Sequence, residues 1–421
     1  MSELSQPLPP VMEMSGTQHI HRARMMNLAV IIAGLCTFLQ VYVTQPLLPA
    51  FRRIFSASEI KVSMTVSAVT VGVAIAAPVV GLLADITGRK RVIVPAIFAI
   101  AIPTLLSATA SSLNQLIFWR FLQGLCIPGI IAVIMAYIAE ESEPGTAGTI
   151  TANYVTGTVV GGLAGRLVAG FCADHLSWQI AFVILGITTI LSGLVVWKWL
   201  PPSQHFTRAT HPLDTLRAMT QHLHNPRLVA SYFVGFNVLF CLVGVFTYVN
   251  FYLAGEPFGL STSELGMVFL VYALGIFVTP VSGILIDKLG HKRAFVISAS
   301  FIASGACLTL IHTLPMVIAG LALFSTGVFM CQSAASAHVA LAAKHARSAA
   351  TGLYSSFYYL GGSVGASVLG VMWHYGHWPA CISLVLVVQM IATSVAYKYF
   401  GAEAEPADPE VEKTSLPPEF G

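Results

Sequence analysis

The chain has 421 residues, of which 56% are hydrophobic and only 9% are charged, with a mean hydropathy of +0.78. Soluble domains carry about 25% charged residues, so this composition excludes an ordinary soluble protein and indicates a chain that lies mostly in lipid. The net charge of +3 says little about partners, and we expect no nucleic acid among them. No P-loop, nucleophile elbow or metal-ligand cluster is present in the sequence, so we expect neither an enzyme nor a bound metal or cofactor.

Twelve stretches of the chain are long and apolar enough to cross a bilayer core of about 30 Å, which takes about 20 helical residues. We expect helices, because backbone in lipid must satisfy its own hydrogen bonds and the alternation typical of barrel strands is absent. The predicted fold class is an all-α membrane protein with twelve transmembrane helices. In chain order the predicted spans are 28–51, 60–84, 92–110, 115–138, 147–172, 179–199, 228–253, 267–286, 294–313, 314–341, 349–373 and 379–399.

The longest connection follows the sixth predicted span and divides the chain into two domains. It contains a polar stretch with helical character from Leu213 to Leu223. Both ends of the chain are polar and contain proline, a composition typical of disordered tails. The predicted organisation is a cytoplasmic tail at 1–27, a six-helix half at 28–199, a cytoplasmic linker at 200–227, a second six-helix half at 228–400 and a second cytoplasmic tail at 401–421.

The positions of Lys and Arg predict the orientation of the chain in the membrane. Sixteen of them fall in the tails, the linker and the loops on the same side, whereas only Arg52, Arg53 and Lys61 fall on the other side. Cytoplasmic loops carry the excess of Lys and Arg, so both termini are predicted to lie in the cytoplasm. The two remaining cations, Arg120 and Arg166, lie within predicted spans.

The sequence contains an internal repeat. The loop after span 2 reads GLLADITGRKR over 81–91, and the loop after span 8 reads GILIDKLGHKR over 283–293, at an offset of 202. A second match, at an offset of 204, relates glycines of span 5 to glycines of span 11. Duplicated six-helix halves are a known basis for alternating access, with the substrate bound near the midplane between them.

These motifs resemble those of the major facilitator superfamily, and the resemblance covers nearly the whole chain. The repeated loop is similar to the most specific motif of that family, and RFLQG at 120–124 is similar to its second motif. The glycine-rich stretch at 157–170 resembles the antiporter motif of drug and metabolite exporters, with Arg166 at the position of the usual proline. The resemblance implies two pseudo-symmetric six-helix halves and a place in the efflux branch of the bacterial inner membrane.

The resemblance also implies that the loop motif acts as a conformational latch. Asp85 would face the start of span 11, and Arg89 would pair with Glu140 or Glu141. The basic residues of the loop could instead serve only to orient the chain, but orientation does not account for the repeated Gly and Asp. The predicted latch residues are Gly81, Asp85, Gly88, Arg89, Glu140, Gly283, Asp287 and Gly290.

Gly157, Gly161 and Gly165 form a face of small residues on span 5 that allows close approach of another helix. Two interpretations stay open from the sequence. The face provides either static packing or a moving contact with span 8.

Charges inside the membrane are rare and usually functional. Arg120 and Arg166 lie at similar depth on neighbouring spans, and no acidic residue lies in a span away from its ends. They must therefore reach polar partners such as Gln40 or Asp174, extend towards the interface, or hold an anionic substrate group. A coupled proton would have to use Asp85, Asp174 or His338. The predicted substrate or coupling residues are Arg120, Gln123, Arg166, Gln40, Asn153, Asn237, Tyr358 and His338, with Tyr248, Gln332 and Tyr354 as further cavity candidates.

We expect a monomeric multi-pass transporter of the inner membrane that exports small amphipathic organic compounds or metabolites by alternating access. Its partners would be the small-molecule substrate, the lipid bilayer and protons, which would be exchanged for substrate by antiport. The alternative is a transporter for an anionic metabolite that the intramembrane arginines anchor. A membrane sensor or scaffold would need a signalling domain, and the tails are too short for one.

Overall fold

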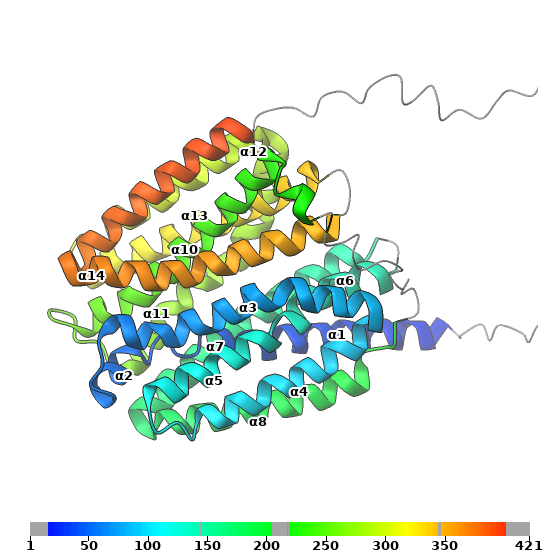
Figure 1. Cartoon of the computed structure of the whole chain (residues 1–421), viewed down its shortest axis with the longest axis horizontal. Coiled ribbons are helices and arrows are strands. Elements are labelled where there is room, and N and C mark those ends of the chain that lie inside the picture. Colours follow the sequence, from blue (N-terminus) through cyan, green and yellow to red (C-terminus); the bar gives the residue numbers. More distant parts are fainter. Residues whose placement is uncertain (1–15, 144, 204–216, 218, 344–346, 401–421) are drawn as a thin grey trace, which may run out of the picture.

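The computed structural model describes residues 16–143, 145–203, 217, 219–343 and 347–400. Helices are the regular elements of this described part, and Figure 1 shows them as two bundles stacked on each other. The first bundle contains α1 (Gly16–Val41), α2 (Leu48–Ile54), α3 (Glu59–Thr87), α4 (Arg89–Ser107), α5 (Leu113–Cys126), α6 (Pro128–Glu141), α7 (Ala147–His175) and α8 (Trp178–Trp199).

The second bundle begins at α10 and ends with α14. Its elements are α10 (Pro226–Ala254), α11 (Thr262–Val268), the 3₁₀ helix η1 (Phe269–Ala273), α12 (Leu274–Leu308), α13 (Leu314–Ala342) and α14 (Arg347–Tyr399).

Ten helices in the described part are long and apolar enough to cross a membrane. Two of these contain a break that divides them into two crossings. The helix that continues through α12 breaks at Gly290, with a φ of 77°, and α14 breaks at Gly376 and His377. The described part of the chain therefore contains twelve segments that can cross a membrane, and the predicted all-α membrane fold is confirmed.

Several helix boundaries differ from the predicted spans. Helix α1 begins at Gly16, within the predicted tail, and the part of it that can cross a membrane begins at Arg22 instead of the predicted 28. The helix stops at Val41 and resumes at Leu48, since Pro46 and Pro49 lack the N–H groups that a continuous helix needs. The remaining tail residues and residues 204–216 and 218 of the linker lie outside the described residues. Within the polar stretch predicted to be helical, Arg217 and residues 219–222 are described and are helical.

Two further spans are divided in ways that the sequence did not predict. The fourth span consists of α5 and α6, which meet at Pro128. The eighth begins at Thr262, five residues before the predicted start at 267, and narrows into a 3₁₀ turn over Phe269–Ala273.

The two bundles use the same glycine packing between their first and fifth spans. A Cβ added at Gly157 or Gly161 of α7 would overlap a backbone carbonyl of α1. The matching glycines of α14, Gly361 and Gly365, would overlap carbonyls of α10 in the same way. In this conformation the glycine face of span 5, Gly157, Gly161 and Gly165, therefore packs on α1. Whether the face also makes a moving contact with span 8 stays a prediction.

We call the end of the molecule that carries the start of α1 and the end of α14 the terminal side, and the opposite end the distal side. On the distal side the halves are joined. The Ser63 hydroxyl lies 3.1 Å from the Tyr248 hydroxyl, and the Ser67 hydroxyl lies 3.3 Å from that of Ser367. The carboxylate of Asp174 accepts the backbone N–H groups at the start of α11, 3.2 Å from Thr262 N and 2.6 Å from Ser263 N.

The terminal side is packed much less closely. An added Cβ at Gly81, Gly148 or Gly283 would have no neighbouring atom within 4 Å. In Figure 1 the two halves meet at the left, near α2 and α11, and separate towards the right, where α1 begins. The distal side is therefore closed.

Candidate functional site

A cavity of about 370 Å³ lies between the two halves. This volume falls within the usual range for a small-molecule site. Six aromatic residues from both halves form much of its wall, Phe38, Tyr42, Tyr272, Phe329, Tyr358 and Tyr359, together with Val and Leu side chains. The polar lining side chains are Thr158, Arg166, Thr279, Gln332, Ser333 and Ser336.

The cavity opens towards the terminal side. Val155 of α7 and Ser336 of α13 line it near that side, and both are exposed. Arg166 lines it too but is only 2% exposed. Arg166 follows Val155 by eleven residues on one helix, about 16 Å at a rise of 1.5 Å per residue, so the cation lies at the closed distal end.

The guanidinium group of Arg166 has neutral partners. Its Nε and one terminal nitrogen donate to Gln45 Oε1 at 2.9 and 2.8 Å, and its other terminal nitrogen donates to the Gly162 carbonyl at 2.8 Å. Its Cζ lies 4.4 Å from the ring centre of Phe269 and 5.1 Å from those of Tyr42 and Tyr272. The positive charge is thus stabilised by rings and dipoles, and no ion pair to Arg166 occurs among the described residues.

Arg120 is fully buried inside the N-terminal half. Its Nε donates to the Thr65 carbonyl at 3.1 Å, and its terminal nitrogens donate to the carbonyls of Gln40 and Val41 at 2.7 and 2.6 Å and to Gln123 Oε1 at 2.5 Å. Gln40 and Val41 end α1, where helical carbonyls lose their partners and the helix dipole is negative. Arg120 therefore caps the break in the first span. It does not line the cavity, so its prediction as a substrate anchor does not fit its position.

Gln40 and Gln123 belong to the same internal network. Gln123 Nε2 donates to the Thr104 hydroxyl at 2.6 Å, and that hydroxyl lies 3.3 Å from Gln40 Oε1. Gln40 Nε2 in turn donates to the Thr189 hydroxyl at 2.8 Å. Both glutamines are fully buried and tie the helices of one half together. Neither lines the cavity, so their predicted contact with substrate is not supported by their position.

Comparison with known proteins agrees with this architecture. The family model of the Major Facilitator Superfamily matches residues 30–366 and 253–420. The chain belongs to this superfamily. It is 31% identical over 370 residues to the uncharacterized MFS-type transporter YybF of Bacillus subtilis (strain 168), covering 88% of this chain and 92% of that protein. It is 33% identical over 369 residues to the inner membrane transport protein YnfM of Escherichia coli (strain K12), covering 87% and 88%.

Solved structures share the fold. A bacterial homologue of the human lysosomal transporter Spinster, in an inward-facing and unoccupied conformation, superposes with a TM-score of 0.72 at 16% sequence identity. The match covers 91% of this chain and 99% of that structure. At this identity the likeness concerns the fold alone.

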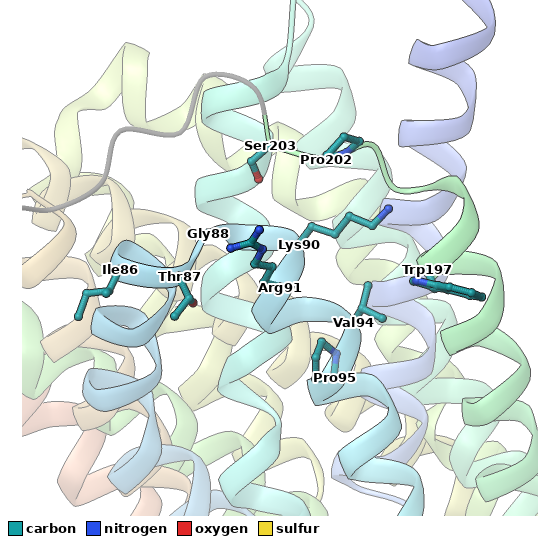
Figure 2. Close-up of a pocket in the computed structure, with 10 residues that line it drawn as sticks. All are labelled: Ile86, Thr87, Gly88, Lys90, Arg91, Val94, Pro95, Trp197, Pro202 and Ser203. Atoms are coloured by element: carbon teal, nitrogen blue, oxygen red, sulfur yellow. The ribbon is translucent and has the colours of Figure 1, made fainter.

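The loop motif of the superfamily folds as a charged cluster on the terminal side. Arg89 donates from Nε to both carboxylate oxygens of Glu140 at 3.1 and 3.2 Å and from a terminal nitrogen at 2.6 Å, and it also bonds Asp85. Gly88 turns the chain between α3 and α4 with a φ of 98°, a conformation that favours glycine. Figure 2 shows Lys90 extending from this turn towards the segment of Pro202, where it bonds the Leu200 carbonyl.

Asp85 bonds Arg89 of its own half, and no contact between Asp85 and the start of α14 is seen among the described residues. In the second copy of the motif, Gly290 also has a positive φ, and His291 stands where the first copy has Arg89. The latch function stays a prediction.

Three further predicted site residues each bond within their own half and do not line the cavity. Asn153 donates to Asn27 Oδ1 at 3.0 Å, and Asn237 donates to Gln389 Oε1 at 2.8 Å. His338 lies 2.8 Å from the Ser231 hydroxyl and stacks on Phe400 with ring centres 4.0 Å apart. Of the predicted substrate and cavity residues, Arg166, Gln332 and Tyr358 line the cavity.

Sequence reasoning missed the residues that surround Arg166. Tyr272 and Phe269 lie on the 3₁₀ turn of span 8, and Gln45 lies in the break of span 1. The prolines near Gln45 were a signal for the break. The cluster around one guanidinium group could not be read from the sequence, because its members come from three different spans.

Proposed function

We propose that this transporter exports small amphipathic organic compounds from the bacterial cytoplasm by alternating access, as a secondary active carrier. One observation carries the proposal. An aromatic-walled cavity lies between the two halves, with its mouth at the terminal side and hydrogen-bonded gates at the distal side. Such walls suit flat apolar molecules, and the few polar groups give them orientation.

The terminal side is the cytoplasmic side in this proposal, because it carries the excess of Lys and Arg. The cavity then takes its substrate from the cytoplasm, and the distal gates open to release it outside. We place the protein in the bacterial inner membrane, where it works as a monomer, since each chain holds both halves and a complete cavity.

The proton-motive force supplies the energy, with protons exchanged for substrate. The residues that line the cavity include no Asp, Glu or His, so a coupled proton binds outside it. Asp174 is the carboxylate that bridges the two halves directly at the distal gate, and it is therefore the first residue to test for this role.

The test is transport by purified protein in proteoliposomes under an imposed pH gradient. The compounds would form a panel of cationic, neutral and anionic aromatic molecules of equal size. We expect gradient-dependent movement of at least one class, absent from protein-free liposomes. Transport of every class at rates that ignore the gradient would overturn secondary active export.

A second experiment tests alternating access. The hydroxyls of Ser67 and Ser367 lie 3.3 Å apart across the distal gate, so a disulfide between Ser67→Cys and Ser367→Cys should lock it. The background carries Cys307→Ser, because Cys307 is exposed. Oxidation should abolish transport by the double variant, and a reductant should restore it. The single variant Ser67→Cys is the control, and continued transport by the locked protein would contradict the proposal.

A further inference from the structure

We infer that the cavity selects organic anions and that Arg166 binds the carboxylate or a similar acidic group of the substrate. The inference rests on the proposed function and adds the chemical class of the substrate. It assigns the acidic head to the distal end of the cavity and the apolar body to the aromatic walls.

The hydrogen bonds of the two buried arginines distinguish their roles. A guanidinium group has five N–H donors. Arg120 uses four hydrogen bonds, three of them to backbone carbonyls, and lies away from the cavity. Arg166 uses three, two to Gln45 and one to Gly162, which leaves one N–H on each terminal nitrogen without an acceptor among the described residues. The two terminal nitrogens are neighbours in the guanidinium plane, a spacing that suits the two oxygens of a carboxylate.

The charge balance points to the same ligand. Arginine stays protonated in proteins, so Arg166 holds a full positive charge in the membrane. Asp174 lies two turns further along the same helix, but its oxygens accept N–H groups at the start of α11. A buried cation without a counterion is costly, and a bound anion would offset that cost.

The surroundings of Arg166 hold it in place. Gln45 accepts from two of its nitrogens at 2.8 and 2.9 Å, while the rings of Phe269, Tyr42 and Tyr272 surround the guanidinium plane. The arginine therefore does not extend to the membrane surface, which is the usual alternative for a cation in a span. A guanidinium group that is already held in place loses little conformational freedom when it binds a ligand.

The position of the cation predicts the shape of the ligand. Arg166 lies at the closed distal end, and Tyr358 and Phe329 line the cavity as aromatic walls. Polar side chains such as Gln332 and Ser336 add hydrogen-bonding groups, with Ser336 near the mouth. An aromatic or alkyl acid with its carboxylate at one end would fit this arrangement, whereas an amine would place like charges together.

An inside-negative membrane potential favours the exit of an anion and adds to the driving force of the exchanged protons. At 100 mV, one elementary charge corresponds to an accumulation ratio of about fifty-fold.

The first test is binding of three compounds of one shape to the purified full chain in nanodiscs. These are 4-phenylbutyrate, the neutral 4-phenylbutyramide and the cationic 4-phenylbutylamine, followed by thermal unfolding or calorimetry. We expect the carboxylate to bind at least tenfold more tightly than the amide, and the amine to bind most weakly. Equal binding of carboxylate and amide would overturn the inference.

A matched pair of variants locates the effect on Arg166. An added Cβ at Gly162 would lie 3.3 Å from a terminal nitrogen of Arg166. Gly162→Asp therefore places an internal carboxylate on the guanidinium group, while Gly162→Asn has the same shape without the charge. We expect Gly162→Asp to lose the preference for phenylbutyrate and Gly162→Asn to keep it. Loss in both variants, or in neither, would contradict a role for the charge of Arg166.

Arg166→Gln provides a second variant. It should bind phenylbutyrate and phenylbutyramide equally, and retained amide binding would show that it folds. If it does not fold, the Gly162 pair still decides, because both members keep the arginine. Carboxylate preference that survives in folded Arg166→Gln would overturn the inference.

Transport separates this inference from the proposed function. In proteoliposomes with a potassium diffusion potential, phenylbutyrate efflux should accelerate as the interior becomes more negative. Transport of the amide or amine without the acid would overturn the anion inference and leave export intact. Binding of the acid without transport of any compound would leave the site intact and overturn export.

Discussion

The N-terminal and C-terminal halves share a packing scheme and differ in charge. In each half the fifth span packs its glycines on the backbone of the first, at Gly161 on α1 and at Gly365 on α10. Each half also ties its first span to its sixth with a buried amide. Gln40 bonds Thr189 at 2.8 Å, and Asn237 bonds Gln389 at 2.8 Å. The shared contacts are therefore those that any such half needs to stay together.

The difference starts at the first span of each half. α10 runs without a break from Pro226 to Ala254, whereas α1 stops at Val41. The break in α1 leaves carbonyls without helical partners, and Arg120 supplies the donors. The C-terminal half has no such break and needs no such cation.

Arg166, the second buried arginine, does not cap a helix break as Arg120 does. The repeat aligns Arg166 with Gly370, at an offset of 204. A Cβ at Gly370 would overlap the hydroxyl of Tyr248, which lies 3.1 Å from Ser63 across the distal gate. One half thus uses the position for gating and the other for a cation at the cavity. This comparison separates a charge that stabilises the fold from a charge that is available to a ligand.

The largest expected effect is that of Arg120→Lys. A single ammonium group cannot reach the carbonyls of Thr65, Gln40 and Val41 together, so at least two hydrogen bonds to a charged group are lost. At about 1.5–3 kcal/mol each, the free energy of unfolding should fall by about 3–6 kcal/mol. The measurement is thermal unfolding of the purified protein in detergent.

Arg53→Lys is the control for this prediction, because Arg53 is an exposed arginine on the distal surface. It should change stability by less than about 0.5 kcal/mol. If Arg120→Lys kept its stability and lost only transport, the difference between the two buried arginines would disappear.

The next prediction concerns the shared packing. Gly161→Ala and Gly365→Ala should each lower the free energy of unfolding by about 1–3 kcal/mol, because both would force a methyl group against a backbone carbonyl. Thermal unfolding of the two variants measures the loss. Gly148→Ala, on the same helix as Gly161, would meet no atom within 4 Å and serves as the control. A loss in one half only would show that the pseudo-symmetry of the packing is superficial.

The sequence predicted the parts of the molecule that repeat or follow from composition. Twelve apolar stretches indicated the twelve crossings, and the offsets of 202 and 204 indicated the two halves. The resemblance to the superfamily implied that Arg89 pairs with Glu140 or Glu141, and the structure contains the ion pair with Glu140.

The functional site was harder to predict, since helix faces cannot be assigned when most of the chain is apolar. Gln40, Gln123 and Asn237 were candidates for the cavity because they are polar, yet each satisfies a neighbour inside its own half. At these three positions a polar side chain within a span makes a buried hydrogen bond and does not line the substrate cavity. Whether such a residue faces the cavity depends on tertiary packing.

A third prediction compares the two copies of the loop motif. Asp85→Asn should slow transport per inserted molecule by about tenfold, because the Arg89 cluster loses about 1.4 kcal/mol of charge-assisted bonding. Asp287→Asn should reduce the rate less, since His291 replaces the arginine there. Initial rates in proteoliposomes, normalised to inserted protein, test the difference. Equal losses would contradict the asymmetry between the copies.

The smallest effect is expected at the distal gate, with Asp174→Asn. The carboxylate accepts two N–H groups at the start of α11, at 3.2 and 2.6 Å, and the amide that replaces it has one oxygen and no charge. A charge at a helix N-terminus contributes about 0.3–1 kcal/mol, so the open gate should become about two- to fivefold more populated. The labelling rate of Ser367→Cys by an impermeant maleimide measures this population.

Glu264→Gln is the matched control for the gate. Glu264 lies at the same helix start, but its carboxylate accepts the Ser261 N–H at 2.8 Å within the C-terminal half. The substitution Glu264→Gln removes a charge from the same helix end without removing a bond between the halves. The labelling rate of Ser367→Cys should therefore stay as it is without the substitution. If both variants accelerated labelling equally, the gate would respond to the stability of α11 alone. Faster labelling in Asp174→Asn alone would identify the Asp174 carboxylate as the contact that holds the N-terminal and C-terminal halves together at the distal gate.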